Sequence, residues 1–322
     1  MDSFKILNKE TWLQTLNISE EELMKVAELK SLFYKKYRKE KPSGYRTIYI
    51  INKDSVLYSL QSKIQKKIFR NIFLPECVYG FRENCSYIDF LTPHISSKNK
   101  FYLRLDIKDF FESISVEYIK DFFQYYIDDK ISNEEKTFIV NSIIDVTTLN
   151  GKFIQGAVTS PSISNFAFRE IDIRILSYCR KLNVRYTRYA DDMLFSSENN
   201  YLNSKHFIIA IQAIINDLGY TLNHAKTLKY KNEISLNGYV IGADIRLSRR
   251  KLHKINELIF QLSKSDFYGF ENNIEKYHIK NQLAGYRSFL IQVNRHVVDL
   301  PYRRHLEERI LTIEKLIIKH FT

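Results

Sequence analysis

The chain has 322 residues, a length that suits about two domains or one large enzyme body. Hydrophobic residues make up 44%, while nine Gly and five Pro exclude a collagen-like or low-complexity chain. Lys and Arg exceed Asp and Glu by 49 − 37 = 12. A basic surplus of this size favours a polyanionic partner, most often nucleic acid.

Cysteine content and apolar runs suggest the cellular compartment. The three cysteines cannot all pair and do not match a zinc-binding pattern, so a reducing environment is expected. The N-terminus lacks the apolar segment of a signal peptide, and no apolar run approaches the roughly 20 residues that span a bilayer. We therefore expect a cytoplasmic protein with no membrane partner.

The first hundred residues predict helices around one strand. Residues 19–40 are expected to form a helix that begins with a capping box made by Ser19 and Glu22. Residues 45–52 predict a strand, and residues 53–74 return to a helical period.

The middle of the chain combines strands with helices. Residues 101–107 alternate in the manner of a strand, and residues 116–149 and 160–182 predict helices. Residues 184–197 predict two strands joined by a tight turn, followed by a helix over residues 203–218.

The end of the chain is helical and basic. Residues 221–246 predict two or three short strands, after which the pattern is helical. From Arg246 to the end there are 15 Lys or Arg against 8 Asp or Glu, a net charge of +7 in 77 residues. This segment is either an ordinary solvated helical subdomain or a surface that lies against a phosphate backbone.

Adjacent carboxylates in a tight turn repel each other unless a cation lies between them. Asp191 and Asp192 stand at the predicted turn, and Asp106 ends the predicted strand before them. Three carboxylates at strand ends of one sheet are suited to two Mg²⁺ ions in phosphoryl transfer. A second Asp pair, Asp128 and Asp129, ends a helical run, and we interpret it as a helix terminus on the surface.

A glycine before a helix lets the backbone approach a ligand closely. Gln155 and Gly156 precede the predicted helix that carries Asn165. Alone this pattern is only a helix cap, but it lies between Asp106 and Asp191.

Seven segments of the chain, taken in chain order, resemble the motifs of bacterial retron-type reverse transcriptases over roughly residues 20 to 300. The segments that carry the resemblance are Arg46–Tyr49, Tyr79–Phe81, Asp106–Phe111, Gln155–Pro161 with Asn165, Arg188–Asp192, Leu222–Thr227 and Asn237–Ile241. Only His94 remains of the Asn-Ala-x-x-His motif of retron enzymes, and Leu236-Asn237-Gly238 replaces Val-Thr-Gly. A true retron enzyme and a related antiviral reverse transcriptase both fit.

The resemblance implies a role for each catalytic residue. Asp106, Asp191 and Asp192, with the backbone of Ile107, would bind two Mg²⁺ ions, for which Mn²⁺ can substitute. Lys226 would protonate the leaving pyrophosphate. Three further residues would bind the incoming nucleotide, Arg46 at the triphosphate, Phe111 under the sugar, and Gln155 with Gly156. Phe110 is expected to be core.

The resemblance also implies contacts with nucleic acid. The residues expected to make them are Asn165, Gly238, Arg249, Arg250, Lys251, Lys254 and Arg287. Tyr286 is expected to stack on bases or ribose, whereas Phe289 is expected to pack inward.

The expected fold is the right-hand polymerase fold, in the α+β class, with an antiparallel palm sheet backed by helices. Residues 1–100 would form the fingers, residues 101–245 the palm with a helical fingers segment near 116–155, and residues 246–322 a basic helical thumb.

The expected function is RNA-directed DNA synthesis from dNTPs on a cognate structured non-coding RNA, in a bacterial anti-phage defence system. The RNA, its DNA product and an effector protein or toxin are the expected partners. The alternatives are a defence reverse transcriptase with atypical or untemplated synthesis, and an inactive polymerase fold that binds RNA. A two-metal nuclease is disfavoured because the motifs follow the polymerase order.

Overall fold

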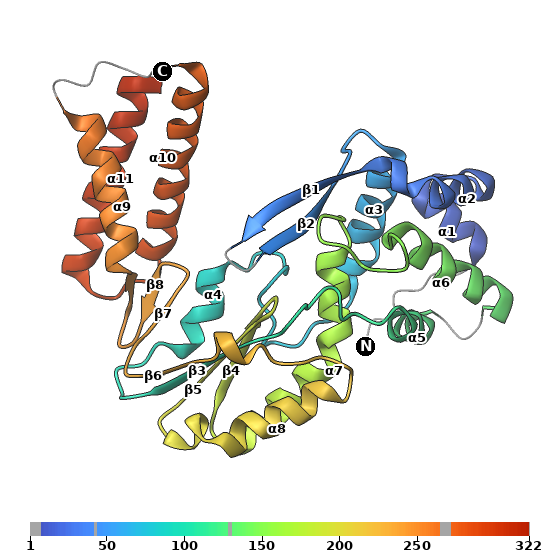
Figure 1. Ribbon diagram of the computed structural model, residues 1–322, viewed down its shortest axis with the longest axis horizontal. Helices are drawn as coiled ribbons and strands as arrows, with labels where there is room; N and C mark the ends of the chain where they lie inside the picture. The colour runs from blue at the N-terminus through green and yellow to red at the C-terminus, as the bar shows by residue number, and fades with distance from the viewer. Residues whose placement is uncertain (1–7, 42–43, 128–130, 265–271, 322) are drawn as a thin grey trace.

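The computed structural model describes residues 8–41, 44–127, 131–264 and 272–321. Figure 1 shows three parts: N-terminal helices with a long β-hairpin, a sheet backed by helices, and a C-terminal helical bundle. These parts are the fingers, palm and thumb of the predicted right-hand fold, and the predicted α+β class is confirmed. No helix in the described ranges is long and apolar enough to cross a membrane.

The fingers combine short helices with one β-hairpin. The capping box at residue 19 forms as predicted: the Ser19 hydroxyl accepts from the Glu22 N–H, and the Glu22 carboxylate accepts from the Ser19 N–H. The elements up to the palm are α1 (Lys9–Leu16), α2 (Glu20–Glu28), η1 (Lys30–Phe33), β1 (Tyr34–Lys41), β2 (Gly44–Ile51), α3 (Val56–Lys67), η2 (Phe69–Asn71), α4 (Tyr87–Leu91) and η3 (Thr92–His94).

The predicted helix over residues 19–40 is wrong beyond Glu28. The chain turns through η1 and continues as β1, which pairs with β2 from Tyr34 opposite Ile51 to Lys41 opposite Gly44. Residues 34–41 carry five Lys or Arg and no aliphatic side chain, so they have no apolar face that would hold a helix on the core. Pairing with the predicted strand satisfies their backbone instead.

The palm sheet has the strand order β4-β5-β3-β6, and all its pairs are antiparallel. Its helices pack on one side, with α7 against α8 (Figure 1). The strands predicted over 101–107 and 184–197 are confirmed. The palm elements are β3 (Phe101–Asp106), α5 (Val116–Tyr126), α6 (Asn133–Thr147), α7 (Ser160–Lys181), β4 (Arg185–Tyr189), β5 (Asp192–Ser197), η4 (Asn200–Asn203), α8 (Lys205–Asn216) and η5 (His224–Lys226).

Residues 221–246 contain more strands than predicted. β6 (Leu228–Lys231) joins the palm sheet, whereas β7 (Ile234–Leu236), β8 (Tyr239–Ile241) and β9 (Ile245–Leu247) form a separate sheet. A turn at Asn237 and Gly238, both with positive φ, joins β7 to β8. This pattern suits a two-residue hairpin loop, where positive φ favours Asn-Gly.

The thumb is a bundle of three helices, α9 (Arg249–Ser263), α10 (Asn273–Asn294) and α11 (Leu300–Phe321). Aliphatic side chains at helical spacing face its interior, such as Leu283 and Leu290 on α10 and Leu306 and Ile313 on α11. The same core includes α4 and the strands β7 to β9, so the thumb is anchored on the palm side.

Candidate active site

The three predicted acidic residues lie at one end of the palm sheet. Asp106, the last residue of β3, lies directly opposite Asp192, the first residue of β5. Asp191 is the preceding turn residue, and its carbonyl accepts the Ile107 N–H at 3.0 Å. Asp106 and Asp192 are buried residues, at 2% and 9% exposure. Antiparallel pairing of two distant segments therefore brings the acidic groups together.

Two basic side chains neutralise these carboxylates. The Lys226 ammonium donates to Asp106 Oδ1 at 2.9 Å, so the predicted lysine lies beside the site. Arg104 donates through Nε to Asp192 Oδ1 at 2.9 Å, and its terminal nitrogen lies 3.6 Å from Asp106. Sequence reasoning missed Arg104, although alternation along a strand places residues 104 and 106 on one face.

The acidic cluster fits a divalent cation by its chemistry. Asp106 Oδ2 is buried and has no hydrogen-bond partner, so one carboxylate oxygen remains for a ligand. Burial raises the pKa of Asp192, and Arg104 opposes that shift. Within the described ranges, no three acidic, His or Cys side chains converge as they stand on one metal position. Oxygen donors of this kind are the ligands that Mg²⁺ prefers.

A buried ion pair holds the turn that carries Asp191. Arg188 and Asp172 are fully buried, and the guanidinium donates to both carboxylate oxygens at 2.7 to 3.0 Å. Arg188 also donates to the carbonyl of Ala190 at 3.0 Å. Burial would lower the pKa of Arg188, but Asp172 outweighs this and raises it. The guanidinium therefore fixes the backbone one residue before Asp191.

The turn itself has an unusual backbone. Ala190 has φ +56, in the left-handed region that residues other than glycine rarely adopt. Gly80 lies against this turn, and a Cβ at Gly80 would lie 2.4 Å from the Ala190 nitrogen. Only glycine allows this close approach, which explains the Tyr-Gly-Phe motif beside the acidic turn.

Asn165 has a different role from the one expected. Its side chain is fully buried, donates to the Gly80 carbonyl at 2.9 Å and accepts from Arg188 at 3.1 Å. Both polar atoms of its side chain therefore have partners inside the protein. It joins the loop at Gly80 to the buried ion pair and positions the acidic turn.

The Gln155–Gly156 loop contacts the fingers hairpin. The Gln155 carbonyl accepts the Tyr49 N–H at 3.2 Å. Gly156 has φ +110, and a Cβ there would lie 1.7 Å from the Tyr49 carbonyl oxygen, so another residue would displace the hairpin. Arg46 lies on β2 opposite Lys39, and its side chain is outside the described part.

Phe110 and Phe111 lie beside the acidic cluster in different surroundings. Phe110 packs against Phe168 and Tyr220, so its expected place in the core is confirmed. Phe111 is 9% exposed, and its ring centre lies 6.2 Å from that of Phe81. Its role at the nucleotide sugar stays a prediction.

The residues predicted to contact nucleic acid in the thumb fall into two groups. Arg249, Arg250 and Lys254 are exposed on α9. Lys251 and Arg287 have protein partners. The Lys251 ammonium lies 4.6 Å from the centre of the Phe289 ring and 5.0 Å from that of Tyr286. Arg287 donates to Glu314 on α11 at 2.7 Å.

Gly238 and the second acidic pair complete the predicted set. A Cβ at Gly238 would lie 3.4 Å from the Lys251 side chain, so this glycine supports the base of the thumb. Asp128 and Asp129 lie outside the described residues.

Comparison with known proteins agrees with this geometry. Residues 37–241 match the family model of reverse transcriptase (RNA-dependent DNA polymerase). The chain is 28% identical to the retron Ec73 reverse transcriptase of Escherichia coli over an alignment of 284 residues, and the match covers 84% of this chain and 85% of that protein. It is 26% identical to the retron Ec86 reverse transcriptase of the same species, covering 91% of this chain and 84% of the relative. The predicted resemblance to retron-type enzymes is confirmed.

Two solved structures match the chain at low sequence identity. A telomerase from Candida albicans in complex with a fragment of telomeric RNA is 12% identical, with a TM-score of 0.48 over 89% of this chain and 64% of that chain. A foamy viral protease-reverse transcriptase in complex with double-stranded DNA is 16% identical, with a TM-score of 0.41 over 92% of this chain and 48% of that one. Since the family model covers 205 of the 322 residues, the chain belongs to the reverse transcriptase family, the RNA-directed DNA polymerases.

Proposed function

We propose that this enzyme copies a cognate structured non-coding RNA into DNA by two-metal phosphoryl transfer. The observation that carries the proposal is the meeting of Asp106, Asp191 and Asp192 at one sheet end, with Lys226 at 2.9 Å from Asp106. Strand register sets the positions of Asp106 and Asp192, and the turn that carries Asp191 is held by Arg188.

Each residue around the acidic cluster has a separate role in the proposed reaction. The carboxylates of Asp106, Asp191 and Asp192 and the Ile107 carbonyl would hold Mg²⁺, which would supply positive charge beside the primer hydroxyl and the leaving pyrophosphate. Lys226 holds a proton beside Asp106 and donates it to the pyrophosphate. Arg188 holds the Ala190 carbonyl and so keeps Asp191 in place while charge changes nearby.

The incoming dNTP is bound between palm and fingers. Gly156 brings the Gln155 loop against Tyr49, and Arg46 lies three residues earlier on the same strand. Phe111 forms the floor beneath the sugar, where a bulky ring excludes a 2′-hydroxyl. An arginine on the hairpin suits the triphosphate because its planar donors match phosphate oxygens.

The proposal extends to an RNA partner and to anti-phage defence. The exposed cations of α9 support binding of a phosphate backbone, and the likeness to retron enzymes supports a dedicated non-coding RNA. Sequencing the nucleic acid that copurifies with the protein tests this partner, and the expected product is a chimeric RNA–DNA molecule. Recovery of unrelated cellular RNA without linked DNA contradicts a dedicated template.

The metal-site roles are tested by Asp191→Ala and Asp192→Ala. Loss of a carboxylate that holds metal costs several kcal/mol of transition-state stabilisation, so dNTP incorporation should fall about a thousandfold or more. RNA affinity should change less than about twofold, because carboxylates do not bind phosphate. Primer extension and filter binding measure the two quantities.

Asp217→Ala is the matched control, because this Asp is exposed and pairs with Arg174 away from the site. It should retain activity. An active Asp191→Ala variant would contradict the assignment. The same variants, tested by phage plating on cells that carry the intact system, should lose protection if DNA synthesis drives defence.

A further inference from the structure

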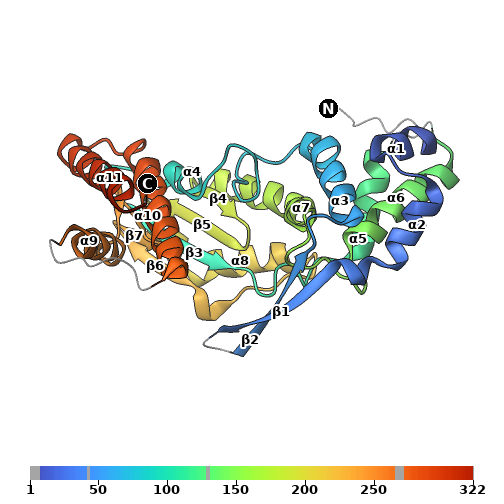
Figure 2. The same ribbon diagram turned by 90° about the horizontal axis from the view of Figure 1, so that it is seen from above.

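One positive charge inside the palm sheet has no part in the proposed reaction. Arg104 lies on β3, two residues before Asp106, in the sheet that runs between the thumb and the fingers (Figure 2). Side chains alternate along a strand, so residues 104 and 106 share one face of the sheet. The Arg104 side chain is 19% exposed, so most of it is buried. A buried guanidinium is costly unless it is paired, and its partners therefore indicate its role.

The neighbours of Arg104 across the sheet are apolar. Leu194 on β5 and Leu228 on β6 lie directly opposite it. Leu194 is fully buried in the same core as Tyr102, which precedes Arg104 by two residues. An aliphatic side chain would suit this position in packing, whereas arginine brings a charge into it. The arginine is therefore explained by the acidic residues at the strand end and not by packing.

Arg104 contacts two of the three acidic residues at once. Its Nε donates to Asp192 Oδ1 at 2.9 Å, and its Nη2 donates to the same oxygen. Nη2 also lies 3.6 Å from Asp106 Oδ1. Asp106 and Asp192 stand directly opposite each other on β3 and β5, where like charges repel. One guanidinium that touches both carboxylates offsets this repulsion and fixes their spacing.

The second cation of the cluster differs from Arg104 in its freedom to move. Lys226 lies on η5, and its side chain is 53% exposed. It reaches Asp106 with a flexible stem, so its ammonium can follow a phosphate group. The planar fork of Arg104 is enclosed in the sheet and donates to Asp192 through two nitrogens. Arg104 is therefore a fixed charge of the site, and Lys226 is an adjustable one.

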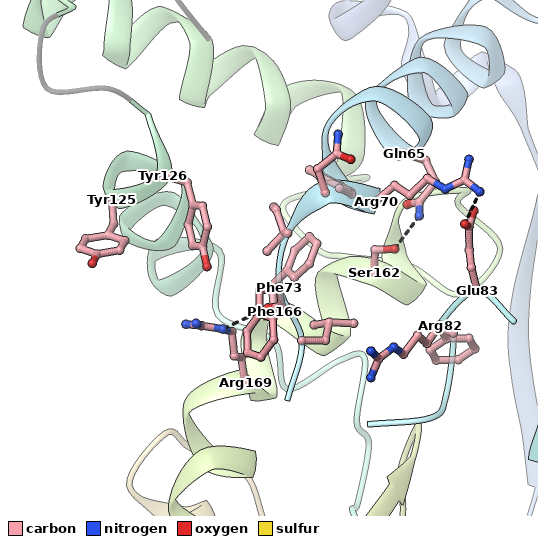
Figure 3. Close-up of a pocket in the computed structure, with 15 residues that line it drawn as sticks. Gln65, Arg70, Phe73, Arg82, Glu83, Tyr125, Tyr126, Ser162, Phe166 and Arg169 are labelled. Carbon is pink, nitrogen blue, oxygen red and sulfur yellow. Dashed lines mark hydrogen bonds and ion pairs between the residues drawn. The ribbon is translucent and has the colours of Figure 1, made fainter. Parts of the chain in front are cut away.

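An arginine pair in the fingers provides a contrast with Arg104. Beside a cavity of about 1100 Å³ between the end of α3 and the first half of α7, Arg70 pairs with Glu83 (Figure 3). More than half of each of these two side chains is exposed. Such a pair contributes little, because water screens both charges. The Arg104 pair is mostly buried and is screened less, so its charge acts strongly on any ion that binds the same carboxylates.

We propose that Arg104 is a positioning residue, a built-in counter-ion that lowers the affinity of the acidic cluster for a divalent cation alone. Its charge holds Asp106 and Asp192 in place before the cation enters, and the same charge repels the cation. In phosphoryl-transfer sites one or two carboxylates hold Mg²⁺ together with phosphates of the substrate. The cluster therefore fills when a nucleotide adds its phosphate oxygens. The inference rests on the proposed function, because it takes the cluster as the metal site.

The test measures binding of Mn²⁺ alone to the full chain, by the loss of the electron paramagnetic resonance signal of free Mn²⁺. Arg104→Gln removes the charge but keeps a donor for Asp192, and it should tighten Mn²⁺ binding about tenfold. Arg104→Lys keeps the charge and should bind Mn²⁺ as the wild type does. Arg70→Gln is the matched control, because it removes a paired arginine outside the cluster, and it should leave the affinity unchanged. Equal Mn²⁺ affinities in the wild type and Arg104→Gln would overturn the inference.

Urea unfolding with and without Mg²⁺ separates this role from a purely structural one. Without Mg²⁺, Arg104→Gln leaves two facing carboxylates with less positive charge, so it should be less stable than the wild type. The same concentration of Mg²⁺ should stabilise the variant more than the wild type, because a ligand that binds the folded state more tightly stabilises it more. An equal loss of stability with and without Mg²⁺ would assign Arg104 to folding alone. A variant that stays unfolded at every Mg²⁺ concentration would do the same.

Primer extension distinguishes a failure of the inference from a failure of the proposed function. If the wild type does not extend a primer with Mg²⁺ and dNTPs, or if Asp191→Ala extends it equally well, the cluster is not the catalytic metal site. The proposed function is then wrong, and the inference falls with it. If the wild type extends the primer and Asp191→Ala does not, the proposed function stands. The Mn²⁺ affinities and the Mg²⁺ dependence of unfolding then decide on Arg104 alone.

Discussion

Charged side chains are buried at the catalytic hairpin and exposed on the thumb. At the hairpin, Arg188 and Asp172 are both 0% exposed, and the guanidinium grips the backbone of the acidic turn. On α9, Arg249, Arg250 and Lys254 face outward. A buried ion pair is costly unless its geometry is fixed, whereas exposed cations act mainly through their field. Charge thus fixes geometry in the hairpin and attracts the ligand in the thumb.

The difference predicts where substitutions act. Changes in the hairpin should alter stability and catalysis and should depend little on salt. Changes in the thumb should alter binding and depend strongly on salt, with little effect on folding. Each prediction below tests one side of this contrast.

The largest effect on stability is expected for Arg188→Gln. The change leaves the Asp172 carboxylate buried without its cation, which costs about 3–5 kcal/mol of unfolding free energy. Urea unfolding measures the loss. Arg174→Gln is the matched control, because it breaks an Arg–Asp pair with Asp217 on the surface. Such pairs contribute at most about 1 kcal/mol. Equal losses of unfolding free energy in the two variants would contradict the difference between the buried ion pair and surface charges.

The second largest effect is expected on the preference of the enzyme for dNTP over rNTP. Phe111→Ala opens the floor beneath the sugar, so the preference for dNTP over rNTP should fall by about a hundredfold, the scale of one lost steric contact. Single-nucleotide extension with each substrate in parallel measures the ratio. Phe110→Leu is the control, since Phe110 packs in the core against Phe168 and should affect stability alone. An unchanged ratio in Phe111→Ala would make Phe111 a core residue as well.

A smaller effect concerns His94, which is fully buried between the hydroxyls of Ser196 and Thr187. Burial lowers the pKa of His94 well below its usual value, so it stays neutral in the folded protein. The unfolded chain binds a proton below about pH 6.5, and stability is therefore lost as pH falls through that value. Between pH 7.5 and 5.5 this loss is about 1.4 kcal/mol.

His94→Gln should remove this part of the pH dependence, as measured by urea unfolding at both values. His253→Gln, at an exposed position on α9, should leave the pH dependence as it is in the wild type. If His94→Gln keeps the wild-type pH dependence of stability, the His94 imidazole is not the cause of that dependence.

Motifs with fixed spacing made the palm predictable. The strands around Asp106 and Asp191, and the helix from residue 160, follow from alternation and from Pro161 at a helix start. That Asp106 and Asp191 lie on one sheet was inferred from their places at strand ends, and the family resemblance supported it. The Arg188–Asp172 pair was not predicted, because nothing local indicates that α7 presents Asp172 to β4.

Elsewhere the sequence signal was weak or misleading. Residues 34–41 were assigned to the preceding helix because they are charged and carry no alternating apolar pattern, yet they pair with β2, the next strand along the chain. In the thumb, composition predicted the basic surface but not its individual contacts. Lys251 and Arg287 look like their exposed neighbours in the sequence, yet one lies over Phe289 and the other pairs with Glu314. Such assignments depend on packing between helices.

The role of the exposed thumb cations is tested by the salt dependence of nucleic-acid binding. Each phosphate contact contributes about 0.9 to the slope of log K against log salt in a duplex, and about 0.7 in a single strand. Neutralising Arg249, Arg250 and Lys254 together should therefore flatten the slope by roughly two to three units. Lys251→Gln alone should change it by less than about one unit, because that ammonium already lies over two rings. Extension of a saturating primer–template should survive in the triple variant, since the acidic cluster lies elsewhere. A slope that does not change would mean that these cations face only solvent, and the thumb would then hold nucleic acid through its shape alone.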